Sequence, residues 1–120
     1  MIVLTDSNKK LQLVLGGAIT TNALEWSVTY EELYASDEIR TVTVTGTSNN
    51  TTDVDVVTAP DENIIKMKNI KRVTVYNADT VVADVFLKID DGGTETILKK
   101  ETSLAVGGTL YWPPYVSLYS

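Results

Sequence analysis

Apolar and polar residues alternate with a period of two along most of this chain, the pattern of strands with one buried and one wet face. In Lys71 to Tyr76 the two valines point one way, while Thr74 and Tyr76 point the other way. Apolar residues then recur at every second position of the next segment, at Ala83, Val85, Leu87 and Ile89. The polar breaks Asn77 to Thr80 and Asp90 to Gly93 are typical of tight turns. Residues 71–100 therefore predict two successive β-hairpins.

Similar alternation predicts the other strands. Leu24 to Tyr34 places Trp26, Val28 and Tyr30 on one face, and a strand is favoured there over a helical turn near Glu31-Glu32. From Ile65 onward we expect Ile65 and Met67 to face inward and Lys66 and Lys68 to face outward. The remaining predicted strands are residues 9–15, 40–45, 54–56, 104–106 and 110–112.

Turn-forming residues separate these segments. Gly46 to Thr52 is the most polar stretch of the chain, and we expect an exposed loop there. About eight short strands with little helix predict an all-β fold, a single antiparallel β-sandwich of jelly-roll or immunoglobulin-like connectivity. At 120 residues the chain has the length of one domain over 1–120, with a short N-terminal arm over 1–8 and an aromatic C-terminal tail over 113–120.

The amino-acid composition limits the catalytic and metal-binding chemistry that this chain can carry out. The chain has no His and no Cys, so it lacks the commonest general base, the commonest zinc ligand and any thiolate. Asp90-Asp91-Gly92-Gly93 is interpreted as a turn, because calcium needs six to eight oxygen ligands. Asp53 and Asp55 are interpreted as a solvated strand face instead of a catalytic carboxylate pair. We therefore expect no enzyme activity, no catalytic residues, no metal site and no cofactor.

Charge and hydropathy bear on partners. The formal net charge is −6, which argues against binding to nucleic acid, since affinity for a polyanion depends on Lys and Arg. No segment approaches the roughly 20 apolar residues of a membrane-spanning helix. We expect neither nucleic-acid binding nor a membrane anchor.

Aromatic residues are the remaining candidates for function. Phe86 shares a strand face with Asp84 and Lys88, so it needs a cover, either a loop or tail of its own chain or another subunit. The C-terminal segment from Tyr111 combines two prolines with several aromatics, which are the residue types that dominate binding energy. The candidate protein-interface residues are Trp26, Phe86, Trp112, Tyr115 and Tyr119, although Trp26 also suits a place in the core.

The order of several motifs resembles a family of small virion proteins of tailed bacteriophages. The resemblance spans most of residues 11 to 112. The motifs that carry it are a glycine after an N-terminal strand, Thr20-Thr21-Asn22 leading to Trp26-Ser27-Val28-Thr29-Tyr30, a polar Asn/Thr loop, Val73 to Thr80 followed by a Val-rich strand, Asp91-Gly92-Gly93-Thr94, and Leu98 through Gly108-Thr109-Leu110. The Pro113-Pro114 tail departs from this pattern.

This resemblance implies a β-sandwich that is a structural part of a phage particle, with no catalytic motif. The expected function is that of a capsid decoration (cement) subunit, located in the virion after assembly in the bacterial cytoplasm. Its expected partners are the major capsid protein or another virion structural protein, and copies of itself, with a trimer favoured. The alternatives are a head–tail connector, a tail or baseplate component, and a carbohydrate-binding module at a fibre tip.

Overall fold

A computed structural model describes residues 2–5 and 7–113 of the chain. These residues form nine β-strands and no helix, so the all-β prediction is confirmed. The strands are β1 (Ile2–Leu4), β2 (Lys9–Leu15), β3 (Glu25–Tyr34), β4 (Ile39–Thr47), β5 (Val54–Val57), β6 (Ile65–Tyr76), β7 (Ala83–Asp91), β8 (Thr94–Leu104) and β9 (Thr109–Trp112).

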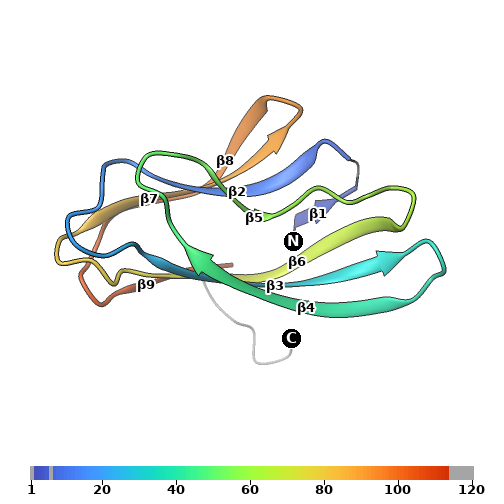
Figure 1. The fold of residues 1–120 in the computed structure, drawn as a ribbon, viewed down its shortest axis with the longest axis horizontal. Helices are drawn as coiled ribbons and strands as arrows, with labels where there is room; N and C mark the ends of the chain where they lie inside the picture. The colour runs from blue at the N-terminus through green and yellow to red at the C-terminus, as the bar shows by residue number, and fades with distance from the viewer. Residues whose placement is uncertain (1, 6, 114–120) are drawn as a thin grey trace.

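The strands pack as two antiparallel sheets, one above the other (Figure 1). Sheet A has the order β1-β6-β3-β4, and β9 also pairs with β6; sheet B has the order β5-β2-β7-β8. The N-terminal arm expected over residues 1–8 contains β1, which pairs with Lys68 to Ile70 of β6 and places Leu4 in the core. The described residues contain no helical segment with the length and apolarity to span a bilayer.

The inward positions of the two-residue alternation form the core between the sheets. Trp26, Val28 and Tyr30 of β3 are buried, as predicted from the sequence. The other buried residues at alternating strand positions are Leu11, Leu13, Leu15, Val56, Val73, Val75, Val85, Leu87 and Leu110. Burying aliphatic side chains of this size contributes about 1.5–3 kcal/mol each before conformational entropy is counted.

One of the two predicted hairpins is correct. The β7–β8 hairpin turns at Gly92 and Gly93, whose φ angles of 59° and 101° suit glycine at both positions of a tight turn. The predicted β6–β7 hairpin is wrong, because β6 lies in sheet A and β7 in sheet B. β6 already pairs with β3 on one side and with β1 and β9 on the other, so the chain after Tyr76 must cross to the second sheet.

Lys66 is exposed, as predicted, but the predicted inward position of Met67 and the outward position of Lys68 in β6 are wrong. The β6 register against β3 shifts between Thr29 and Tyr30, which leaves Lys71 as an extra residue. This bulge reverses the alternation before it, so Lys68 is buried and Met67 lies on the opposite face. The Lys68 Nζ donates to the carbonyl and hydroxyl oxygens of Thr58, at 3.0 and 3.1 Å.

The polar loop predicted over Gly46 to Thr52 begins later than expected. Gly46 and Thr47 belong to β4, and Ser48 is buried, with its hydroxyl accepting the N–H of Leu24 at 3.0 Å. The ladder between β3 and β4 continues past the predicted strand end, through the pairs Trp26–Gly46 and Glu25–Thr47. Gly46 lies against the ring of Trp26. The exposed part of this connection is Asn49 to Asp53.

Candidate interaction surfaces

Trp26 lies inside the sandwich. Its side chain is 7 % exposed, and it packs in the core on the inward face of β3. A Cβ atom added at Gly46 would lie 2.8 Å from Trp26 Cε2, so the indole occupies the space that a side chain at 46 would need. Within the described part of the chain, Trp26 is a core residue.

Phe86 is half-buried on the outer face of sheet B, which is the face turned away from sheet A. Its strand neighbours are Val14 of β2 and Lys100 of β8, and the Lys100 Nζ lies 5.4 Å from the centre of the Phe86 ring. A lysine over an aromatic face gives a cation–π attraction and covers apolar surface with its methylenes. Adjacent strands thus supply part of the cover that Phe86 needs.

Trp112 is half-buried at the edge of the core, in β9 opposite Val73. Together with Ile70, Lys71 and Pro113 it lines a small hollow. Trp112 and Trp26 belong to sheet A, whereas Phe86 lies on the outside of sheet B, so these three predicted residues do not form one surface. Tyr115 and Tyr119 lie outside the described residues.

Two exposed tyrosines were not among the candidates. Tyr76 is 42 % exposed and Tyr111 is 51 % exposed, on the adjacent strands β6 and β9. They are diagonal neighbours, because Tyr76 pairs with Thr109 and Tyr111 with Thr74, a spacing within reach of aromatic side chains. Their alternation with the buried residues Val75 and Leu110 is the sequence signal that identifies them as outward-facing.

A hollow beside Tyr76 continues across the outer face of sheet A. Its lining combines one carboxylate, two aromatic residues and several hydroxyl groups: Glu25, Trp26, Ser27, Thr45, Gly46, Thr47, Thr74 and Tyr76. Strand pairing aligns Tyr111, Thr74, Ser27 and Thr45 in one row across the sheet. The surface is uncharged apart from Glu25, and it presents hydrogen-bonding groups next to exposed aromatic rings.

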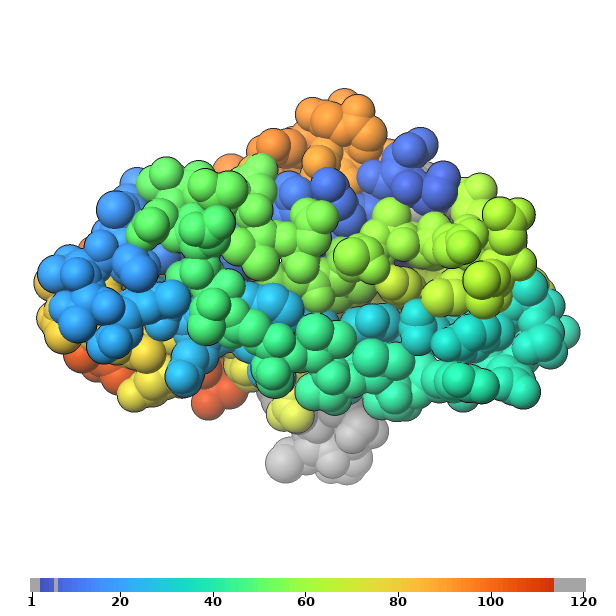
Figure 2. All heavy atoms as spheres, in the orientation of Figure 1, coloured from blue at the N-terminus to red at the C-terminus, as the bar shows by residue number. Residues whose placement is uncertain are grey.

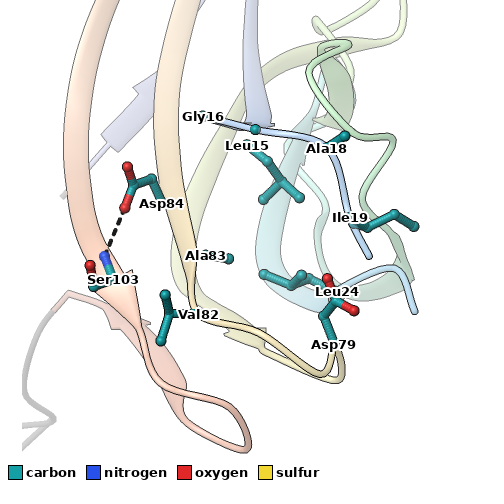
Figure 3. A pocket seen from close by; sticks show the side chains of 11 residues that line it. Leu15, Gly16, Ala18, Ile19, Leu24, Asp79, Val82, Ala83, Asp84 and Ser103 are labelled. Carbon is teal, nitrogen blue, oxygen red and sulfur yellow. Dashed lines mark hydrogen bonds between the residues drawn. The ribbon is translucent and has the colours of Figure 1, made fainter. Parts of the chain in front are cut away.

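Asp79 organises one end of the sandwich, where Figure 3 shows its carboxylate beside a hollow bordered by Leu24, Ala83 and Asp84. The carboxylate accepts four backbone N–H groups at 2.8–3.1 Å, those of Thr20, Thr21, Asn22 and Thr80. The Thr20 N–H leads in holding the pKa of Asp79 well below its usual range, although burial acts in the opposite direction. Asp84 is also engaged, because it accepts the N–H of Ser103 at 2.8 Å (Figure 3).

Asn77 completes this end of the molecule. Its side chain is fully buried, and its Nδ2 donates to the carbonyl oxygens of Val81 and Leu104, both at 2.9 Å. Its Oδ1 accepts the N–H of Asp79 at 2.9 Å. The Tyr-Asn-Ala-Asp-Thr motif therefore joins three loops through Asn77 and Asp79, whose side-chain polar atoms are engaged in structural hydrogen bonds.

A charged network covers the outer face of sheet B. Lys88 is only 7 % exposed, and its Nζ lies 2.9 Å from Asp53 and 2.6 Å from Glu95. Burial disfavours its charge, but the two carboxylates outweigh burial and raise the pKa of Lys88. Asp55 accepts the Nε2 of Gln12 at 2.8 Å and lies 3.5 Å from the Lys10 ammonium. Asp55 is exposed on β5, as predicted, whereas Asp53 is exposed directly before that strand; each has a basic partner.

The described residues contain no group of three or more His, Cys, Asp or Glu side chains placed to share a metal ion. Comparisons with protein-family models, with curated proteins and with solved structures found no match for this chain.

Proposed function

We propose that this chain is a non-enzymatic structural protein of a tailed-phage particle, most specifically a capsid decoration subunit that binds the assembled shell. The proposal combines the resemblance of its motifs to phage virion proteins with the surface of the sandwich. The polar groups of Asn77, Asp79 and Lys88 are engaged within the fold, whereas several apolar side chains remain exposed.

The observation that carries the proposal is an exposed apolar tip at the end of the sandwich held by Asn77. The tip consists of Tyr76, Val81, Val82 and Val106, which are 41–58 % exposed. These residues lie close together, because Asn77 bonds the carbonyl of Val81 and accepts the N–H of Gly107 at 2.9 Å. Contiguous exposed apolar residues at a rigid end favour a protein partner.

The proposed stabilisation of the capsid needs binding alone and no catalysed reaction. A capsid presents many equivalent sites, and a symmetric oligomer that spans neighbouring subunits converts several weak contacts into firm attachment through effective concentration. A bound layer of this kind would resist the outward pressure of packaged DNA.

Binding to phage particles tests the proposal. Purified protein is mixed with particles that lack this chain, and bound copies are counted by quantitative mass spectrometry after sedimentation. We expect a copy number that matches the many equivalent sites of the shell, and we expect Val106→Asp to reduce it. The matched control is Ile64→Asp, because Ile64 has the same 54 % exposure as Val106 but lies in the β5–β6 connection outside the tip. A copy number equal to the number of subunits in a single small ring would instead indicate a head–tail connector, tail or baseplate component.

A second candidate function is carbohydrate binding at a fibre tip, favoured by the hollow beside Tyr76. Tyrosine rings next to a carboxylate and hydroxyl groups can stack on a sugar ring and bond its hydroxyl groups. A glycan array probed with the wild-type protein, with Tyr111→Ala and with Tyr76→Ala tests this candidate. Wild-type binding that both variants lose would support it, and an array silent for the wild type would contradict it.

A further inference from the structure

The strands at the sheet edges differ in how well they are protected against pairing with another chain. β1, β5 and β9 are three or four residues long. β8 is long, but its register against β7 shifts twice and it carries Lys99 and Lys100. Short length, bulges and lysines are devices that keep edge strands from pairing.

β4 has few of these protections, since its one charged residue is Arg40 near its start, which is paired with Glu38 of its own chain. It is nine residues long, its register against β3 is unbroken from Glu25 opposite Thr47 to Leu33 opposite Ile39, and it contains no Lys or Pro. Among the described strands it pairs with β3 alone. It runs along the side of the sandwich nearest the viewer in Figure 1, and in Figure 2 its teal to green residues lie at the surface along the lower front.

The backbone geometry shows which groups point to the open side. The Tyr34 N–H bonds the Glu38 carbonyl at 2.8 Å, at the turn that starts the β3–β4 ladder. In antiparallel pairs the bonded residues alternate, so even-numbered β4 residues direct their N–H and C=O toward β3. The odd-numbered residues Thr41, Thr43 and Thr45 direct theirs to the open side.

Charge favours this edge as a contact between copies. The chain has a net charge of −6, so most approaches of two copies are repulsive, but the twelve residues from Thr41 to Thr52 carry no charge. Ile39 is 63 % exposed, and Val42 and Val44 are only half-buried although they face the core. The apolar positions of β4 thus lack part of their cover.

We propose that β4 pairs antiparallel with β4 of a second copy about a two-fold axis at Thr43. This register aligns the whole strand, with Thr41 opposite the second copy's Thr45 and Val42 opposite the second copy's Val44. It provides about ten backbone hydrogen bonds, joins sheet A of both copies into one continuous sheet and covers Ile39 and the two valines. The contact is isologous, so it closes at two copies. The pairing concerns the isolated protein and does not depend on the proposed function.

Introducing a charge at the two-fold axis tests both the β4 edge as the contact surface and the proposed register. Thr43 is exposed, and a substitution there faces its own copy across the axis, so Thr43→Lys and Thr43→Glu each place like charges opposite each other. We expect the wild type to have twice the chain mass of 13.1 kDa by light scattering. We expect each variant alone to dissociate with a dimer constant weaker by roughly an order of magnitude, and an equimolar mixture to regain the dimer.

Matched variants keep the test independent of folding. Ile97→Lys places the same charge on the exposed part of β8, and we expect it to remain dimeric. Circular dichroism and the urea midpoint must show that both Thr43 variants are folded, and recovery of the dimer in the mixture is itself evidence that they are. A monomeric or trimeric wild type would overturn the proposal, as would variants that dimerise as well as the wild type or a mixture that stays monomeric.

Discussion

Replacing Asn77 is the most direct test of how the end of the sandwich is held together. In Asn77→Ala the carbonyl oxygens of Val81 and Leu104 lose a donor and the Asp79 N–H loses its acceptor. The bonds to the Leu104 carbonyl and from the Asp79 N–H are buried, and leaving each buried group unsatisfied costs about 1–3 kcal/mol, whereas the partly buried bond to Val81 costs about 0.5–1.5 kcal/mol. We therefore expect a loss of at least about 2.5 kcal/mol in the free energy of unfolding.

Urea unfolding followed by tryptophan fluorescence measures this loss. The midpoint should fall while the slope stays constant, because the surface exposed on unfolding is nearly unchanged. Asn63→Ala is the control, since Asn63 is exposed in the β5–β6 connection and should change stability by less than about 0.5 kcal/mol.

Asn77→Asp separates hydrogen bonding from packing. It keeps the shape of the side chain but turns a buried carboxylate toward two carbonyl oxygens, and protonation at low pH restores one donor. We expect the deficit relative to the wild type to shrink as the pH falls toward about 4. A loss below about 1 kcal/mol in Asn77→Ala, or a deficit in Asn77→Asp that does not depend on pH, would refute the assigned role of this amide.

Three further changes probe other parts of the fold. Gly46→Ala forces a methyl group against the Trp26 ring and should cost about 1–3 kcal/mol in urea unfolding; an unchanged midpoint would contradict the close packing. The pKa of Asp79 lies below its unfolded value of 3.8, so the stability that its carboxylate contributes is present above pH 3.8 and is lost as the pH falls further. The melting temperature of Asp79→Asn should therefore depend less steeply on acid pH than that of the wild type. Parallel curves of melting temperature against pH would argue against this contribution. Burial lowers the pKa of Lys68, so the folded state binds the Lys68 proton less tightly than the unfolded state does. The free energy of unfolding in urea of the wild type, relative to that of Lys68→Met, should therefore rise between neutral pH and about pH 10. A difference that stays constant with pH would exclude the effect.

Local alternation was sufficient to predict most strands and their inward residues. In β2, β3 and β7 nearly every second residue is apolar, with Glu32 of β3 as an exception, and the extra residues at the register shifts lie in their partner strands, so the pattern carries directly into burial. β6 shows where local alternation fails, because Ile70 and Val73 are three residues apart and both face the core only through the bulge at Lys71. That bulge depends on pairing with β3, and a two-residue period along the chain carries no information about this pairing.

The β6–β7 connection and the interaction surfaces depend on contacts that are distant in sequence. Asn77 to Thr80 has the composition of a turn, but its partners at Thr20 and Leu104 direct the chain across to the other sheet. Phe86 was correctly identified as outward-facing, and its contact with Lys100 follows from the pairing of β7 with β8. Tyr111 was part of the aromatic segment, but its position beside Tyr76 follows only from the pairing of β9 with β6.

The central position of β6 has a consequence for biosynthesis. β6 pairs with β1 from the beginning of the chain and with β9 from its end, so sheet A is complete only after Trp112 has left the ribosome. Such distant pairings slow folding, and a ribosome-bound intermediate would display strand edges that the finished protein conceals. Emergence of β9 is therefore the step at which the Val73 to Tyr76 part of β6 gains its second neighbour and no longer presents an open edge.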